Sequence, residues 1–346
     1  MRTANSKIAL VAGGSGFIGS HLVDALLAEG ATVVCLDSFT TGRPGNLRHL
    51  HGESRFDFVE ADVIDELPAA VSRRRFSHVY NLACAASPPH YQMDPEHTML
   101  TNVVGTRNLL RLAEEKGARF LLTSTSEVYG DPEQHPQTES YRGWVNCTGP
   151  RACYDEGKRA AETLAFDFQR LRRADVRVAR LFNTYGPRMR PDDGRVVSNV
   201  ICQALAGEDV TIYGDGSQTR SFCYVSDLVD GLMRLMASDV RDGPVNLGNP
   251  VELTVSDLAE RVLRMTGSRS RISYRPLPID DPRRRRPDIG RAKALLGWEP
   301  KVTLQQGLEA TAAWFAQERD SAEPVDAEGE SEAAEARRLS LGVAAE

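Results

Sequence analysis

Short apolar runs alternate with amphipathic stretches along the first half of the chain. Six runs are continuous and β-rich, as in strands buried on both faces of a parallel sheet: residues 7–12, 32–37, 56–63, 78–83, 119–125 and 176–183. Between them, residues 18–29, 95–116 and 152–172 have the apolar spacing of helices. Repeated strand–helix units predict an α/β fold with a doubly wound parallel sheet.

The pattern loosens after Asn183. A turn-rich loop leads to a helix at 196–206, a strand at 210–214, a helix at 225–236 with a Ser or Asp cap, a strand within "GPVNLGN", and a helix at 254–266 opened by Thr254 or Ser256. We expect a sheet domain of residues 1–182 plus about 224–250, and a smaller lobe of about 183–223 plus 251–317. Residues 318–346 are acidic and lack aromatic side chains, which predicts a disordered tail or a loose helix.

Composition narrows the class of protein. The chain has 346 residues, 41% hydrophobic and 26% charged, and a net charge of −6 that does not favour a nucleic-acid partner. It lacks the roughly 18 consecutive apolar residues of a membrane span and an apolar segment near its start. Six scattered cysteines, without a C-x-x-C motif, argue against a metal site or a disulfide framework. We expect a cytoplasmic enzyme or binding protein without a membrane partner.

A glycine-rich turn directly follows the first strand. Gly13, Gly16 and Gly19 have the spacing G-x-x-G-x-x-G, which permits a tight turn and close approach of a pyrophosphate to the helix N-terminus. The second strand ends in Asp37, whose carboxylate would bind the adenosine ribose and repel a 2′-phosphate. The pattern predicts NAD rather than NADP, although Arg43 lies close by; a glycine turn of another α/β fold is the alternative.

A tyrosine and a lysine lie four positions apart at the start of a predicted helix. Tyr154 and Lys158 would share one helical face, and Thr125 ends the preceding strand at the edge where α/β sheets bind ligands. A nearby ammonium group would lower the pKa of the tyrosine and make it a general base. Chance occurrence of the pair in a packed helix is the alternative.

Several of these stretches resemble the extended short-chain dehydrogenase/reductase family, whose members modify nucleotide sugars. The glycine turn, "STSEVYGD" and "YDEGK" carry the resemblance, which covers about residues 7–317. It implies a Rossmann sheet that binds NAD and a smaller substrate-binding lobe. The stretches "GPRACYDEGKRAAE", "RLFNTYGPRM" and "RRRRPDIGRAKALLGWEP" resemble the branch that decarboxylates UDP-glucuronate to UDP-xylose. That branch implies a lyase that forms a 4-keto sugar and returns hydride internally to C4.

The resemblance also assigns roles by position. Tyr154 would be the base, Thr125 would bond the C4 oxygen, and Lys158 would also hold the nicotinamide ribose. Ser126 and Glu127 would lie near the substrate carboxylate, with anionic Glu127 disfavouring it in the ground state. Arg285 would be the active-site arginine, although charge alone makes residues 283–286 a solvated basic run or a nucleic-acid patch.

The remaining implied contacts involve both ligands. Those to the cofactor are Gly13, Gly16, Phe17, Ile18, Gly19, Asp37, Ser38, Thr41, Gly42, Asp62, Val63, Leu82, Thr101, Tyr154, Lys158, Thr184 and Arg195. Those to the substrate are Ser87, Asn102, Asn183, Tyr213, Arg220 and Arg285. Arg220 and Asn183 would hold the diphosphate, and Tyr213 would pack on the uracil. The chain departs from the family pattern at Leu100, where a lysine is common, and at Cys84, where a serine is common.

Three rival functions stay open. A 4-epimerase of a UDP-sugar would share the Thr–Tyr–Lys set but would not need Arg285. A 4,6-dehydratase would carry Asp–Glu after Thr125, where this chain has Ser126 and Glu127. A non-catalytic NAD-binding regulator would usually lose the tyrosine or the lysine. The resemblance also implies a homodimer through residues 95–116 and 152–172, although their apolar positions could equally serve the internal core.

Overall fold

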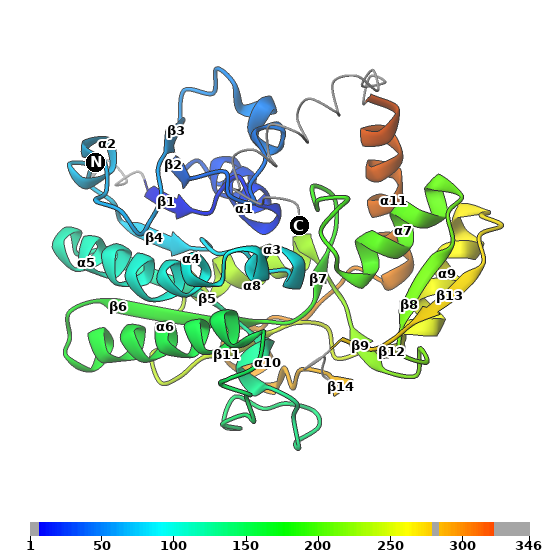
Figure 1. The fold of residues 1–346 in the computed structure, drawn as a ribbon. Helices are drawn as coiled ribbons and strands as arrows, with labels where there is room; N and C mark the ends of the chain where they lie inside the picture. The colour runs from blue at the N-terminus through cyan, green and yellow to red at the C-terminus, as the bar shows by residue number, and fades with distance from the viewer. Residues whose placement is uncertain (1–6, 279–283, 322–346) are drawn as a thin grey trace, which may run out of the picture.

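The computed structural model describes residues 7–278 and 284–321 and is built around a seven-stranded sheet (Figure 1). The strand order is β11-β6-β5-β4-β1-β2-β3, and every neighbouring pair is parallel. The strands are β1 (Ile8–Ala12), β2 (Thr32–Asp37), β3 (Phe56–Glu60), β4 (His78–Asn81), β5 (Arg119–Thr125), β6 (Asp175–Leu181) and β11 (Val245–Leu247). The order reverses between β1 and β4, which confirms the predicted doubly wound sheet.

Two hydrophobic cores cover the two faces of this sheet. Val11 and Val33 pack with helices α1 (Phe17–Ala28) and α8 (Val225–Ala237). The adjacent Leu10 and Val34 point the other way and pack with α5 (Thr106–Lys116) and α6 (Ala152–Arg170). Because both faces are covered, neighbouring residues of each strand are apolar, and this explains the continuous apolar runs in the sequence.

A third core lies beside the sheet, where Figure 1 shows a second group of elements. It contains α7 (Val196–Ala206), α9 (Val255–Thr266) and α11 (Leu304–Ser321), together with the parallel pair β8 (Val210–Tyr213) and β13 (Ile272–Arg275). Short strands connect this group to the sheet: β7 (Thr184–Tyr185), β9 (Thr219–Ser221), β10 (Cys223–Tyr224), β12 (Glu252–Thr254) and β14 (Arg284–Arg285). Thr254 caps α9 in a capping box with Asp257, one of the two predicted openings of that helix.

Seven short helical segments complete the described chain. They are η1 (Pro44–Leu50), α2 (Ala69–Ser72), α3 (Pro88–Met93), α4 (Pro95–Leu100), η2 (Thr101–Gly105), η3 (Ser126–Tyr129) and α10 (Gly290–Leu296). Within the two described ranges, no helix is both long and apolar enough to cross a membrane.

The predicted continuous helix at 95–116 is interrupted. Its central part, η2, is a π-helical turn between α4 and α5. The turn buries Asn102 against α6, where a Cβ on Gly157 would lie only 3.0 Å from the Asn102 Nδ2 atom. Local widening of a helix of this kind is not visible in apolar spacing, because the pattern on either side remains helical.

Three further boundaries differ from the predictions. Tyr224 precedes α8 without a side-chain cap, so the predicted Ser or Asp cap is wrong. The third strand ends at Glu60 rather than at residue 63. Helix α11 continues to Ser321, so residues 318–321 belong to this helix and not to a separate tail. The rest of the predicted tail, residues 322–346, lies outside the described residues.

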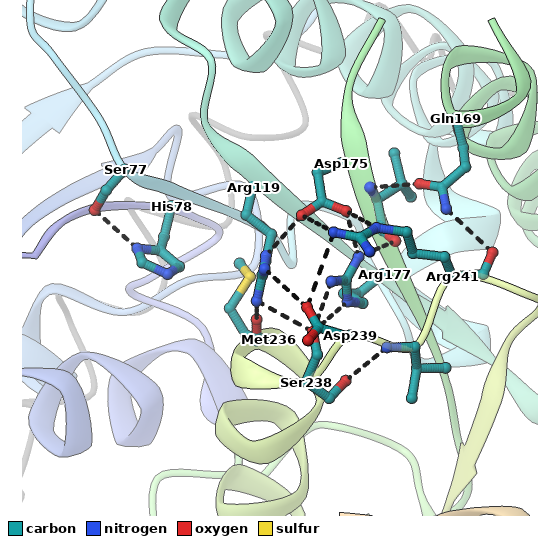
Figure 2. Close-up of polar contacts among 12 residues, drawn as sticks. Ser77, His78, Arg119, Gln169, Asp175, Arg177, Met236, Ser238, Asp239 and Arg241 are labelled. Atoms are coloured by element: carbon teal, nitrogen blue, oxygen red, sulfur yellow. Dashed lines mark hydrogen bonds and ion pairs between the residues drawn. The ribbon is translucent and has the colours of Figure 1, made fainter. Parts of the chain in front are cut away.

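An arginine cluster ties the end of α8 to the amino ends of β5 and β6 (Figure 2). Asp175 accepts bonds from Arg119 (2.9 Å), Arg177 (2.7 Å) and Arg241 (2.8 Å). The Arg177 side chain is fully buried and donates to the Ser238 carbonyl at 2.6 Å, while Arg119 donates to the Met236 carbonyl at 2.7 Å. These carbonyls end a helix, where cations are stabilising. Burial would raise the pKa of Asp175, but bonds from Arg241 and Arg177 hold it far below its usual value.

Candidate active site

The glycine turn connects β1 to α1 at the point where the strand order reverses. Gly13 has φ +79°, and a Cβ there would lie 2.6 Å from the carbonyl carbon of Leu82. A Cβ on Gly19 would overlap the carbonyl oxygen of Gly13. Gly16 is the N-cap residue of α1 and provides no side-chain hydrogen bond to the first N–H groups of the helix. The turn therefore combines close backbone approach with donors for an anion.

Asp37 lies beside this turn at the end of β2. Its two carboxylate oxygens accept bonds from the Ser15 and Phe39 N–H groups, both at 2.9 Å. Gly42 packs against it, since a Cβ there would lie 2.8 Å from Asp37 Oδ1. The carboxylate predicted to bind a ribose is thus fixed next to the glycine turn.

A cavity of about 560 Å³ opens at the carboxyl ends of the central strands. It is lined by most of the predicted site residues, from both the sheet and the neighbouring lobe. From the predicted cofactor set these are Gly16, Phe17, Ile18, Gly19, Thr41, Leu82, Thr184 and Arg195. From the catalytic and substrate sets they are Thr125, Ser126, Glu127, Tyr154, Lys158, Ser87, Asn183, Tyr213, Arg220 and Arg285.

Eight predicted residues do not line the cavity: Gly13, Asp37, Ser38, Gly42, Asp62, Val63, Thr101 and Asn102. Asp62 bonds His97 Nε2 at 2.7 Å. Asn102 is buried and donates to the Cys84 Sγ atom at 3.2 Å and to the Thr98 carbonyl at 3.0 Å. The structure therefore brings Cys84, and not Asn102, to the cavity wall.

Tyr154 and Lys158 lie on one face of α6, as their spacing predicts. The Lys158 ammonium lies 5.8 Å from the centre of the Tyr154 ring and donates to the Thr123 carbonyl at 3.0 Å. Both side chains are buried, and Thr125 lies at the adjoining end of β5. The three groups thus converge at one wall of the cavity.

The pKa of Tyr154 does not follow the prediction. Burial is the largest influence and raises it above the ordinary tyrosine value, while hydrogen bonding with Thr125 opposes the rise. Burial also lowers the pKa of Lys158. The expected lowering of the Tyr154 pKa is therefore wrong for this structure, because desolvation of the phenolate is the largest influence on it.

Glu127 and Arg285 form an ion pair in the same cavity. Arg285 donates to Glu127 Oε2 at 3.1 Å and to the Ser126 carbonyl at 2.7 Å, and it is 1% exposed. The Glu127 N–H donates to Thr125 Oγ1 at 3.2 Å, which fixes the start of η3. Arg285 lies on β14, where it pairs with Arg220 of β9. The arginine thus reaches the end of β5 from a strand of the lobe.

A second arginine, Arg151, also contacts Glu127 and was not predicted. Its Nη2 atom lies 3.0 Å from Glu127 Oε2. Burial alone would raise the pKa of Glu127, but neighbouring guanidinium groups, chiefly those of Arg285 and Arg151, hold it below the usual value. Ground-state repulsion by a lone anionic glutamate does not fit this arrangement, because two cations neutralise the carboxylate. The signal for Arg151 was its position three residues before Tyr154, on the same helical face.

Two further groups lie near Tyr154. The Tyr91 ring lines the cavity and stacks on the Tyr154 ring with centroids 5.0 Å apart and an interplanar angle of 4°. Burial, together with the charge of Glu127, raises the pKa of the Asp155 carboxyl above its usual value.

Two further arginines and an exposed aromatic ring line the cavity. Arg220 is buried and lies opposite Arg285 in the β9–β14 pair, and Arg195 is ion-paired with Asp193. Tyr213 is 45% exposed, so its ring is accessible to a planar ligand. These residues can therefore hold an anionic group and a flat ring.

Comparison with known proteins finds a matching family and close relatives in sequence. Residues 10–311 match the family described as GDP-mannose 4,6 dehydratase. UDP-glucuronic acid decarboxylase 2 of Arabidopsis thaliana is 56% identical over 308 residues, which are 89% of this chain and 68% of the relative. UDP-glucuronic acid decarboxylase 1 of Danio rerio is 53% identical over 312 residues, 90% of this chain and 73% of the relative.

A solved structure shows the same fold with ligands. UDP-glucuronic acid 4-epimerase from Bacillus cereus, in complex with UDP-glucuronic acid and NAD, superposes with a TM-score of 0.82 at 28% identity. The match covers 90% of this chain and 99% of that one. The predicted family resemblance is confirmed by these similarities.

Proposed function

The chain belongs to the GDP-mannose 4,6 dehydratase family of extended short-chain dehydrogenases/reductases, and on that premise we propose that it decarboxylates UDP-glucuronate to UDP-xylose with a bound NAD. It is a carboxy-lyase, in keeping with relatives at 52–56% identity that carry this activity in their names. The observation that carries the proposal is the meeting of Thr125, Tyr154 and Lys158 with the Glu127–Arg285 pair in one cavity.

The residues of the glycine turn fit a dinucleotide. Gly13 and Gly19 leave no room for side chains where the backbone would meet the ligand, and the first N–H groups of α1 have no side-chain cap. We assign the pyrophosphate to these N–H groups, the adenosine ribose to Asp37, and the nicotinamide half to Leu82, Thr184 and Lys158. When bound, NAD supplies the oxidant for C4 of the sugar and gives the same two electrons back at the end of the cycle.

Tyr154, Thr125 and Lys158 serve the chemistry at C4. Tyr154 accepts the proton of the C4 hydroxyl as this oxygen becomes a ketone, and Thr125 bonds the same oxygen. The Lys158 ammonium, 5.8 Å from the centre of the Tyr154 ring, is the cation that would favour the phenolate and so offset part of the rise in pKa that burial causes. In the last step Tyr154 returns the proton to the C4 oxygen.

The Glu127–Arg285 pair, with Ser126 beside it, serves the chemistry at C5. A ketone at C4 and a carboxylate on C5 form a β-keto acid, in which the bond from C5 to the carboxyl carbon breaks. Its electron pair moves to the ketone as an enolate, carbon dioxide leaves, and a proton from solvent is added at C5. Arg285 orients the carboxylate before the bond breaks, and Glu127 holds Arg285 in place.

Arginine, asparagine and tyrosine side chains that line the cavity hold the nucleotide. We assign the diphosphate to Arg220 and Asn183, and the uracil to Tyr213. Residues of about 183–223 and 251–317 would thus form the substrate-binding lobe. Arg195 lies within 5.9 Å of the Phe17 ring, which puts it near the cofactor half of the cavity.

We also propose a cytoplasmic homodimer. Met93, at the end of α3, and Leu100, at the end of α4, are exposed apolar side chains beside the α4–α5 segment. A second copy placed on α4–α5 and α6 would cover them. Light scattering of the purified protein tests the dimer directly, and a monomer at micromolar concentration would contradict it.

The test of the proposed function is a product assay. Purified protein is incubated with NAD and UDP-glucuronate carrying a labelled carboxyl carbon, and both carbon dioxide and the nucleotide sugar are analysed. Release of the label with formation of UDP-xylose is expected, and Tyr154→Phe should abolish it. Formation of UDP-galacturonate with the label retained would identify a 4-epimerase, and NAD binding without turnover would identify a regulator.

A further inference from the structure

Helix α11, the last helix of the described residues, reaches back to the loop that follows β2. The Arg43 Nη2 atom lies 2.8 Å from Glu318 Oε2, across 275 positions of sequence. The two side chains are only 33% and 38% exposed. Such a pair excludes part of the surrounding water, so Arg43 is both neutralised and oriented by Glu318.

The position of Arg43 relates this ion pair to the proposed cofactor site. Its N–H group donates to the Ser15 carbonyl at 3.1 Å, inside the glycine turn. The preceding residue, Gly42, packs directly against the Asp37 carboxylate, and Thr41 lines the cavity. Arg43 therefore belongs to the segment that surrounds the carboxylate assigned to the adenosine ribose.

An arginine at such a place is the usual means of accepting a 2′-phosphate. Its planar guanidinium group can bind phosphate oxygens in a bidentate manner, and an arginine close to the ribose accommodates NADP. Here Glu318 is ion-paired with the Nη2 atom of Arg43, and the buried Nη1 atom of Arg43 has no hydrogen-bond partner among the described residues. The guanidinium group is present but is held by a carboxylate of another element.

We propose that Glu318 is a specificity-determining residue for the dinucleotide. By holding Arg43, it withholds the cation that a 2′-phosphate would need, while Asp37 repels that phosphate directly. Selection of NAD over NADP then depends on two carboxylates, one at the end of β2 and one on the last described helix. This inference rests on the proposed NAD site and adds a residue that lies outside the glycine-turn motif.

The experiment measures dissociation constants of NAD⁺ and NADP⁺ by calorimetry, with the full chain and four variants. Glu318→Gln should bind NADP⁺ about three- to tenfold more tightly, as expected for one partly exposed arginine–phosphate pair, and NAD⁺ within about twofold of the wild type. Arg43→Ala should not gain NADP⁺ affinity, and the double variant should lose the gain of Glu318→Gln. Glu309→Gln is the matched control, since Glu309 lies exposed on the same helix and accepts a bond from Gln305.

The outcomes separate the inference from the proposed function. Wild-type protein that binds neither dinucleotide would overturn the NAD site and the inference with it. Wild-type protein that binds NAD⁺, together with an unchanged affinity ratio in Glu318→Gln, would overturn the inference alone. Equal weakening of the binding of both dinucleotides in Glu318→Gln would also overturn the inference, because this result would show that the ion pair only supports the loop. Thermal unfolding of each variant verifies that the chain remains folded.

Discussion

Replacement of Arg285 with alanine should stop the release of carbon dioxide while the dinucleotide still binds. The side chain is 1% exposed and donates to the Ser126 carbonyl and to Glu127. Its neighbour Arg284 is exposed and belongs to the same basic run. Arg284→Ala is therefore a matched control, since it removes the same charge one position away.

The size of the effect on folding follows from these contacts. Hydrogen bonds to charged groups contribute about 1.5–3 kcal/mol each, so the two bonds of Arg285 amount to about 3–6 kcal/mol. Glu127 keeps its bond to Arg151 at 3.0 Å, so the variant does not leave a bare buried carboxylate. We expect a net loss near the lower end of that range, about 3 kcal/mol of unfolding free energy, which a domain with about 5–15 kcal/mol can tolerate.

The effect on the reaction should be larger. Removal of one preorganised donor at a reacting group typically lowers kcat about 10²–10³-fold, and we expect that range for Arg285→Ala. Arg285→Lys should lie in between, because an ammonium group cannot match both acceptors of the guanidinium fork. Arg284→Ala should stay within about 0.5 kcal/mol of the wild type in stability and show nearly unchanged turnover.

The assay follows carbon dioxide from carboxyl-labelled UDP-glucuronate, with NAD⁺ affinity measured on the same preparations. Slow release of label together with wild-type NAD⁺ affinity would support the assignment. Arg285→Ala turnover within about threefold of the wild type would refute the reasoning, because a difference that small corresponds to less than about 1 kcal/mol.

Three other predictions concern the cofactor turn, the sheet and the thiols. Gly19→Ala should weaken NAD⁺ binding at least about tenfold, because a Cβ at this position would overlap the Gly13 carbonyl oxygen. Gly45→Ala is the control and should leave the affinity unchanged, because a Cβ there meets no neighbouring atom. Equal effects of the two variants in calorimetry would contradict the prediction. Asp175→Asn should lower the free energy of unfolding by about 2 kcal/mol at neutral pH, less than for a fully buried pair because Asp175 is 31% exposed. Since the pKa of Asp175 is held below its usual value, this difference should shrink as the pH falls below about 3.9, and a difference that persists in acid would count against it. Iodoacetamide should modify exposed Cys147 before Cys84, whose thiol pKa is raised by burial; peptide mass spectrometry showing the reverse order would be the contrary result.

The central sheet could be predicted because both of its faces are buried. Each strand then appears as an apolar run, and the helices between them keep an amphipathic period. The strands of the lobe were harder to predict from the sequence, because a strand such as β14 has only two residues and its apolar pattern cannot be distinguished from that of a loop. The interruption of the helix at 95–116 was also hidden, because the apolar pattern on either side of the π-helical turn remains helical.

The site was predictable where motifs lie close together in sequence. Tyr154 and Lys158 share a helical face by their spacing alone. The pKa of Tyr154 was not predictable, because burial is set by residues distant along the chain. The same reason hid the pairing of Arg43 with Glu318, in which a loop near the start meets the last described helix.

The arginine cluster around Asp175 has a consequence for how the sheet opens. The amino ends of β5 and β6 are tied to the end of α8, whereas the last residues at their carboxyl ends border a cavity. Amide protons near Val176 would then exchange with solvent only through cooperative opening of the whole sheet, while those near Thr125 could exchange through small local excursions. Fluctuations that admit and release a ligand would thus be confined to the carboxyl ends of these strands.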